Sequence, residues 1–412
     1  MAEAVPEPGA YAGLRVLDLS HVIAGPMCTK LLAEHGADVV KVEPPAGDMT
    51  RRFPYTYDEG MTTQFAQYNC GKRSIVIDLA SDDGPGLVLA LAERADVLVE
   101  NFRPGVLERL GLPIALLRER NPRLVACSIS TFGQDGELSA KPGYGFVAEA
   151  HSGLMALASD ATDPPSAFGT ALADMVVAVH AFGAIGAALY RRAQTGRGTH
   201  VDVASYETMV STIDHALVLH AFTGGAQRFE GYSRRHPVIV PNGVVAAADG
   251  GHVAYGVTDD TQFAALCALM GDPALAEDPR YATGAARTAA RDAVYDRVDA
   301  WGATVADAAT IARLLEERSI PAARVRGYDE VAEDPQLVQR GVLQPVQIPG
   351  QGSVLIPVAP HHLDGATVGI AGPPPRLGQH TEQVLATDLG LDARAIAELV
   401  AAGTVHDSKA AA

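Results

Sequence analysis

The pattern of hydrophobic and polar positions predicts that strands and helices alternate along residues 1–222. Short runs rich in β-branched residues predict strands at residues 15–20, 37–43, 74–79, 96–100, 124–130 and 200–203. Apolar positions at helical spacing predict helices at residues 26–35, 84–94, 114–120, 174–192 and 206–221. This alternation indicates an α/β fold whose mostly parallel sheet is covered by helices on both faces.

The pattern changes after about residue 222. Two strand-like runs, at residues 244–248 and 252–257, are joined by Asp249-Gly-Gly and predict a hairpin. Helical patterns follow at residues 260–270, 291–301 and 304–318, and another lies at 381–389, before an Ala-rich tail. We therefore expect a large domain that begins at 1–222, a smaller α+β domain at 223–328, and a segment at 329–412 that returns to the large domain.

The composition of the chain excludes some classes of binding partner and indicates the cellular compartment. The chain has 32 basic and 49 acidic residues among 412, a net charge of −17, which argues against nucleic acid and anionic membranes as partners. The four cysteines have no metal-type spacing and suit a reducing compartment. The longest apolar run, residues 175–190, is too short to span a bilayer and contains His180. With no signal-like N-terminus, we expect a cytoplasmic protein.

One acid and three histidines are candidates for chemistry. Asp174 is the only acid between residues 164 and 200, and it opens the long apolar run. It is either an ordinary first-turn acid of a helix or a nucleophilic or proton-transferring carboxylate. His21, at the end of the first strand, has a structural role or contacts a ligand. His361 and His362 are adjacent, so in a strand their side chains point to opposite faces, and we predict no metal site there.

The first strand–helix turn does not fit a dinucleotide site. It contains Gly25 but lacks the Gly-x-Gly-x-x-Gly spacing, and Pro26 removes a backbone N–H group, so an NAD enzyme is disfavoured. Basic residues nevertheless cluster at strand ends and loops, where an open α/β sheet binds ligands. Together they favour an anionic cofactor; they are Lys41, Arg51, Arg52, Lys72, Arg73, Arg103, Arg109 and Lys141.

Several motifs, spread in order over nearly the whole chain, resemble the class III (CaiB/BaiF-type) CoA-transferases. They are VLDLSHVIAGP at 16–26, HGADVVKVEPPAGD at 35–48, NCGKRSIVIDL at 69–79, VENFRPGVLERLG at 99–111, AQTGRG at 193–198 and GQHT at 378–381. The resemblance is weakest across 223–345. It implies a Rossmann-like large domain, an interlocked homodimer, and acyl-CoA and a carboxylic acid as substrates.

The resemblance also implies which residues act. Asp174 falls on the family's catalytic aspartate, whose carboxylate attacks an acyl-CoA thioester and passes through a mixed anhydride and an aspartyl-CoA thioester. The positions that match the family's contacts to coenzyme A are Ile23, Ala24, Ile77, Asp78, Leu79, Asn101, Phe102, Arg103, Arg109, Lys141 and Tyr144. No metal is expected.

Departures from the family pattern define the alternatives. Pro44 stands where several members carry an Arg, which puts one adenine-side contact in doubt, and the glycine-run loop of formyl-CoA transferases has no clear counterpart. An α-methylacyl-CoA racemase would need His-Asp where this chain has Tyr144 and Gly145, and a tyrosine hydroxyl is a poor base at neutral pH. Intramolecular CoA transfer within a dicarboxylic acid remains open, because it needs the same aspartate. The presence of Asp174 argues against a third alternative, a non-catalytic CoA-binding subunit.

Overall fold

Two compact units make up the chain. The computed structural model describes residues 7–58, 61–159, 164–226 and 234–406. Contacts group Met1–His151, Phe168–Ser211 and Pro335–Ala412 into the first unit, and Ser152–Ala167 and Thr212–Asp334 into the second. The domain limits expected from the sequence, at residues 222 and 328, remain a prediction.

The first unit is built on a seven-stranded sheet in the order β14-β5-β2-β1-β6-β7-β8. Its strands pair in parallel except for the edge strand β14, which is antiparallel to β5. The mostly parallel α/β sheet expected from the sequence is therefore confirmed. In chain order the strands are β1 (Arg15–Asp18), β2 (Asp38–Glu43), β5 (Arg73–Ile77), β6 (Val97–Glu100), β7 (Val125–Ser130), β8 (His200–Ala204) and β14 (Val405–His406).

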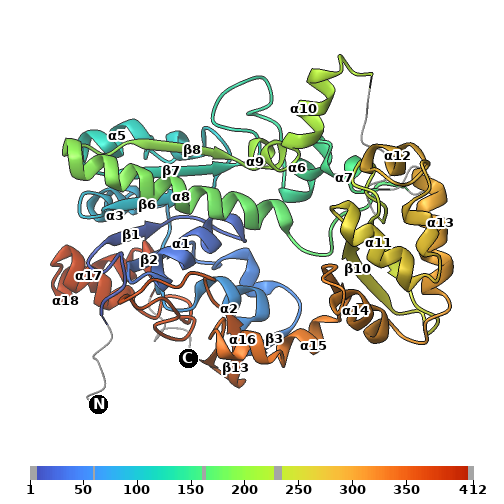
Figure 1. Cartoon of the computed structure of the whole chain (residues 1–412). Helices are drawn as coiled ribbons and strands as arrows, with labels where there is room; N and C mark the ends of the chain where they lie inside the picture. The colour runs from blue at the N-terminus through green and yellow to red at the C-terminus, as the bar shows by residue number, and fades with distance from the viewer. Residues whose placement is uncertain (1–6, 59–60, 160–163, 227–233, 407–412) are drawn as a thin grey trace. The chain divides into compact units, whose positions relative to one another are not determined.

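Helices cover both faces of this sheet because its strands are apolar on both sides. On one face, α1 (Ala24–Glu34) and α8 (Leu172–Thr195) pack on side chains such as Val16, Val97 and Val125. On the other face, side chains such as Leu17, Ile75 and Leu98 form a core with α3 (Gly84–Ala92), α4 (Val106–Arg109), α5 (Ile114–Arg120), α17 (Thr381–Leu389) and α18 (Ala393–Ala401). Figure 1 shows α8 lying along the sheet beside β7 and β8.

Helix α8 is longer than the pattern predicted. It runs over 24 residues instead of residues 174–192, and it ends at Gly196, whose left-handed φ of 71° suits glycine. By length and composition alone it could cross a membrane, with a mean hydropathy of 1.8 over its most apolar window. The core helices of soluble proteins pass the same test, and Val177, Ala181 and Ile185 of α8 are buried against the sheet.

Short elements surround the sheet in the first unit. A buried cluster joins α2 to a hairpin that is distant in sequence, through Phe65, Val346 and Ile356. These elements are η1 (Met49–Arg52), β3 (Thr56–Asp58), β4 (Met61–Thr62), α2 (Thr63–Asn69), α6 (Gly145–His151), α9 (Ser205–Thr212), α16 (Pro335–Gln339), β12 (Leu343–Ile348) and β13 (Gly352–Pro357).

The second unit has its own core around a three-stranded antiparallel sheet in the order β11-β10-β9. Buried Phe263, Tyr295 and Trp301 fill that core. Its strands are β9 (Asn242–Ala246), β10 (His252–Gly256) and β11 (Ala322–Arg324). Its helices are α7 (Leu154–Leu157), α10 (Asp214–Phe222), α11 (Asp260–Leu269), η2 (Pro273–Ala276), α12 (Gly284–Ala289), α13 (Arg291–Gly302), α14 (Ala308–Glu316) and α15 (Tyr328–Ala332).

Three sequence-based elements need correction. The single helix predicted at 206–221 is two helices, α9 and α10, which are separated at Ile213. The helix predicted at 304–318 begins later, because the Asp307 side chain caps α14 by accepting from Thr310 N. The Ala-rich tail after residue 389 forms α18, capped by Asp392, followed by β14 up to His406. Its last residues, 407–412, lie outside the described part.

Candidate active site

Buried charges hold the turn between β1 and α1. The carboxylate of Asp18, which is fully buried, accepts from Ser20 N at 2.9 Å and forms an ion pair with Lys72 at 3.0 Å. Lys41 Nζ donates to Ser20 O at 2.7 Å and pairs with Asp48 at 2.9 Å. Removing one partner of a buried pair exposes the other to an uncompensated desolvation cost, so these contacts fix the turn.

The next residues of the turn are held by two side chains from elsewhere. The Asn101 amide donates to His21 O and accepts from His21 N, both at 2.8 Å. Val22 N donates to the Asp48 carboxylate at 3.3 Å. Val22 itself has a φ of 68°, a left-handed conformation that a β-branched residue adopts only when its surroundings impose it. Such strain is typical of ligand-binding turns.

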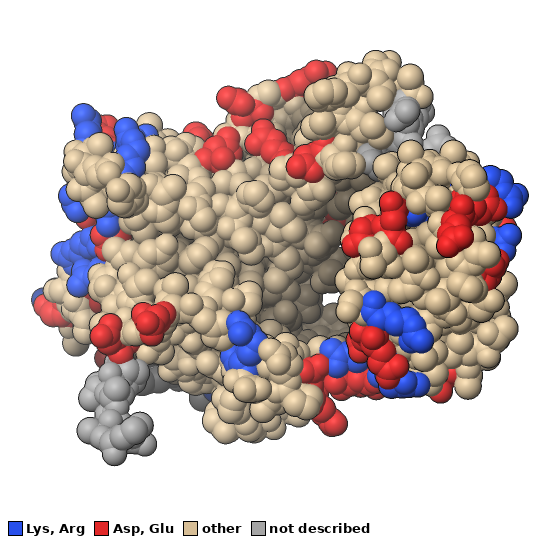
Figure 2. Space-filling view, in the orientation of Figure 1, with Lys and Arg blue, Asp and Glu red and all other residues tan. Residues whose placement is uncertain are grey.

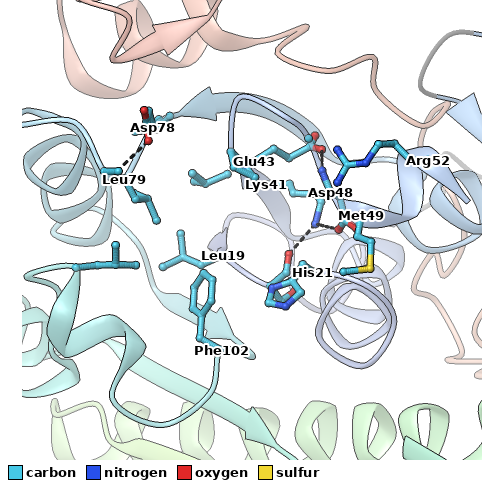
Figure 3. Close-up of a pocket in the computed structure, with 17 residues that line it drawn as sticks. Leu19, His21, Lys41, Glu43, Asp48, Met49, Arg52, Asp78, Leu79 and Phe102 are labelled. Atoms are coloured by element: carbon cyan, nitrogen blue, oxygen red, sulfur yellow. Dashed lines mark hydrogen bonds and ion pairs between the residues drawn. The ribbon is translucent and has the colours of Figure 1, made fainter. Parts of the chain in front are cut away.

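A cavity of about 400 Å³ lies beside this turn at the carboxyl ends of β1, β2 and β5. In Figure 3, Leu19, Leu79 and Phe102 lie on one side of it, and charged side chains such as Lys41, Asp48 and Arg52 on the other. An apolar wall facing a charged one suits an amphipathic ligand. The remaining lining residues are Ser20, His21, Val42, Glu43, Pro44, Gly47, Met49, Ile77, Asp78, Ala80 and Leu110.

A second cavity of about 280 Å³ contains Asp174. His21 and Phe102 line both cavities, and their rings stand 5.4 Å apart between centroids. Asp174 is the one carboxylate among the described residues that line the second cavity. The remaining residues that line the second cavity are Val22, Ile23, Ala24, Asn101, Arg103, Val106, Ile129, Ser130, Thr131, Gly143, Tyr144, Gly145 and Ser205.

Asp174 lies in the first turn of α8, as the sequence indicated, but its side chain does not cap the helix. The N-cap residue is Ala171, and the buried Glu149 carboxylate accepts from Ala173 N at 3.1 Å. Burial raises the pKa of Asp174 to about 6, and the nearby charge of Glu149 contributes to the increase. A more basic carboxylate that is still ionised at neutral pH is suited to nucleophilic attack.

The structure brings most of the predicted site residues together. Ile23, Ala24, Asn101, Phe102, Arg103 and Tyr144 line the cavity of Asp174. Ile77, Asp78 and Leu79 line the larger cavity. Arg109 and Lys141 line neither of these two cavities. The contacts of all these residues to coenzyme A remain predictions.

Half of the cationic cluster expected from the sequence is used for internal ion pairs. Lys72 pairs with Asp18, Lys41 with Asp48, and Arg51 with Glu43 at 2.7 Å, all of them buried. Arg73 pairs with Asp38 and Asp388. Arg52 and Arg103 remain as cations that line a cavity. On the face shown in Figure 2, basic groups lie in small patches beside acidic ones.

Sequence reasoning missed several residues of the site. Thr131 and Ser205 line the cavity of Asp174, and both follow strands, β7 and β8, whose carboxyl ends could have indicated them. Glu149 had no comparable signal, because it comes next to Asp174 only when α6 packs on α8. Among the described residues, no group of three or more His, Cys, Asp or Glu side chains could hold a metal ion.

Comparisons with known proteins define the family. Residues 11–381 match CoA-transferase family III. The succinyl-CoA:mesaconate CoA-transferase of Haloarcula hispanica is 36% identical over 386 residues, which cover 92% of this chain and 96% of that protein. The succinate–glutarate CoA-transferase of Agrobacterium fabrum is 34% identical over 388 residues, which cover 91% and 94%. A crystal structure of a CaiB/BaiF family protein from Brucella suis has a TM-score of 0.81 and 32% identity, and covers 92% and 99%.

These matches extend over nearly the whole chain, including both cavities of the first unit. They define its class, which is that of enzymes transferring coenzyme A. The chain belongs to CoA-transferase family III, and the resemblance seen in its sequence is confirmed.

Proposed function

We propose that this enzyme transfers CoA between carboxylic acids through covalent intermediates on Asp174. The observation that carries the proposal is the position of Asp174, the one carboxylate among the described lining residues of its cavity, with its pKa raised to about 6. The carboxylate is mostly ionised at pH 7 to 8, yet it is more basic than an exposed aspartate. Both properties favour attack on a thioester.

The reaction runs through four balanced steps. An oxygen of Asp174 attacks the thioester carbonyl of the donor, the C–S bond breaks, and CoA leaves as the thiolate, which gives a mixed anhydride. The thiolate then attacks the Asp174 carbonyl of the anhydride and releases the donor acid, which leaves an aspartyl-CoA thioester. The acceptor carboxylate repeats both steps in reverse order, which forms the new acyl-CoA and restores Asp174. Holding the thiolate nearby makes each exchange effectively intramolecular.

Coenzyme A is proposed to extend across both cavities. Its nucleotide end occupies the larger cavity, where Arg52 provides a cation and Leu79 an apolar surface. Its thioester arm passes His21 and Phe102, which line both cavities, and reaches Asp174. Burial lowers the pKa of His21, so its imidazole is neutral at pH 7 and adds no charge to the path of the arm.

The substrates proposed are succinyl-CoA as donor and a short dicarboxylic acid as acceptor. Support comes from the relatives, whose names include the dicarboxylic acids mesaconate and glutarate. A matrix of acyl-CoA donors and acids, analysed by mass spectrometry of the CoA products, tests this choice. Turnover with monocarboxylic acids alone would contradict it. A homodimer is proposed from the family resemblance, and light scattering of the purified protein tests it. A cytoplasmic location is proposed from the four cysteines, whose spacing suits a reducing compartment.

The decisive variants are Asp174→Asn and Asp174→Ala. Each should lower CoA transfer about a thousandfold or more, because none of the other described residues that line this cavity has a carboxylate to form the anhydride. CoA binding, measured by calorimetry, should change less than threefold. Asp135→Asn removes an exposed carboxylate and serves as the charge-matched control with full activity.

A chemical test identifies the covalent step. During turnover, hydroxylamine should convert Asp174 of the wild-type enzyme to a hydroxamate, which peptide mass spectrometry detects. Near-normal turnover of Asp174→Asn would refute the mechanism. Exchange of an α-hydrogen in D2O without CoA transfer between acids would instead support an isomerase.

A further inference from the structure

Helix α6 places a second buried carboxylate beside the first turn of α8. Glu149 is only 1% exposed, and its Oε1 accepts from Ala173 N at 3.1 Å. The first N–H groups of a helix lack partners within the helix, and the N-cap residue Ala171 has no polar side chain to supply one. Glu149 therefore holds the backbone of the residue that directly precedes Asp174.

The same helix leaves room for the Asp174 carboxylate. Gly145 lies one turn before Glu149 on α6, so both residues are on one helix face. A Cβ atom at Gly145 would lie 2.6 Å from Asp174 Oδ2 and 3.4 Å from Ala173 Cβ. Helix α6 thus leaves space for the Asp174 carboxylate at Gly145. One turn later, its Glu149 carboxylate binds the backbone N–H of Ala173.

The charges that face Asp174 come from several elements. Burial and then the charge of Glu149 on α6 raise the pKa of Asp174, and burial and then the charge of Asp174 raise the pKa of Tyr68 on α2. His21, Arg103 and Tyr144 line the same cavity. Apart from Asp174 itself, Glu149 is the one carboxylate among these side chains, and its burial keeps water away from it.

We infer that Glu149 is a positioning residue for Asp174, which fixes the first turn of α8 and keeps a negative charge beside the nucleophile. This role rests on the function proposed for Asp174. The charge makes the nucleophile more basic, and the hydrogen bond to Ala173 N sets where it points. Gly145 contributes by leaving the gap into which the carboxylate of Asp174 fits.

The test is the pH dependence of kcat in Glu149→Gln. Glutamine keeps the volume and an oxygen that can accept from Ala173 N, but it removes the charge. Asp174 must be ionised to attack, so kcat rises with pH through the pKa of Asp174. Without Glu149 that rise should move about one pH unit lower, and the plateau kcat should fall about three- to tenfold because the nucleophile is less basic. The KM for acyl-CoA should stay within twofold.

Two further variants separate charge from hydrogen bonding. Glu149→Asp keeps the charge but shortens the side chain, so the pH profile should stay in place while kcat falls. Gly145→Ala should lower kcat by at least tenfold, because the added methyl group collides with the nucleophile. Glu119→Gln, an exposed acid on α5, removes the same charge and should leave both the profile and kcat unchanged.

The outcomes are distinguishable from failure of the proposed function. Hydroxylamine trapping on wild-type Asp174 judges the covalent mechanism without any change at Glu149. If trapping succeeds but Glu149→Gln keeps the wild-type pH profile, the electrostatic role is overturned. If Glu149→Gln does not fold, Glu149→Asp decides the positioning role, and an unchanged kcat in that variant overturns it.

Discussion

Two aspartates in the same unit, fully buried Asp18 and half-buried Asp174, have opposite environments. Asp18 accepts hydrogen bonds from Ser20, Thr29 and Lys72. Burial by itself would raise its pKa, but Lys72, Lys41 and the hydroxyl donors together hold the pKa of Asp18 well below its usual range. At Asp174, burial and Glu149 act in the same direction, and both raise the pKa.

The difference explains why one acid is structural and the other suits chemistry. The donors around Asp18 use the capacity of its oxygens to accept hydrogen bonds, so it is a permanent anion that fixes a turn. Asp174 faces a cavity and has an anion beside it, so its ionised form is costly and correspondingly basic. Residue type alone does not distinguish the two; the sign of the neighbouring charges does.

The largest effect on stability is expected for Asp18→Asn. It leaves buried Lys72 without the carboxylate that pairs with it and removes a nearby negative charge from Lys41, so the free energy of unfolding should fall by about 3–5 kcal/mol at pH 7. A group whose folded pKa is lowered stabilises above its unfolded pKa, about 4, so the difference from wild type should shrink as the pH falls below that value. Urea unfolding measures it, and a loss below about 1 kcal/mol would mean that the network is not the main stabilising feature of the turn.

Asp174→Asn should have the opposite effect on stability. The folded pKa of Asp174, about 6, lies above its unfolded value, so the wild type loses stability as the pH rises from about 4 to about 6 and stays destabilised above that range. The Asn variant avoids this loss, so it should be more stable than wild type at pH 8 by roughly 2 kcal/mol and nearly equal at pH 4. Thermal unfolding at both pH values checks this. Equal stability at pH 8 would show that Asp174 is well solvated.

The sequence predicts the environments of Asp18 and Asp174 only where the contacting residues lie close together in the chain. The strands could be predicted because runs such as residues 37–43 and 74–79 are rich in β-branched residues, and β2 and β5 lie at those places with most of their residues buried. The ion pair of Lys72 joins residues 54 positions apart, so no local pattern signals it. For the same reason, Lys72 looked like a cation available to a ligand.

The environment of Asp174 has the same limitation. Periodicity predicted an acid at the start of a helix, and only the family resemblance gave it a chemical role. Glu149 acts on Asp174 through Ala173, which lies 24 positions away in the chain, and α6 itself was not predicted. A short helix that begins with Gly145 has too few apolar positions to reveal its packing partner.

The smallest effect on stability is expected for Thr29→Val, which tests how much the Thr29 hydroxyl contributes to the hydrogen-bond network of Asp18. Thr29 Oγ1 donates to Asp18 at 2.6 Å and accepts from Lys72 Nζ at 2.8 Å, so Thr29→Val removes two contacts at nearly constant volume. A hydrogen bond to a buried charge is worth about 1.5 kcal/mol, which is the loss expected in urea unfolding. Thr387→Val, at an exposed position of α17, should cost less than about 0.5 kcal/mol. In the Asp18→Asn background the cost of Thr29→Val should shrink, because the hydroxyl then donates to a neutral amide oxygen. An equal cost in both backgrounds would mean that Thr29 stabilises α1 independently of Asp18. The anionic state of Asp18, in contrast to the basic carboxylate of Asp174, would then depend on Lys72 and Lys41 and not on Thr29.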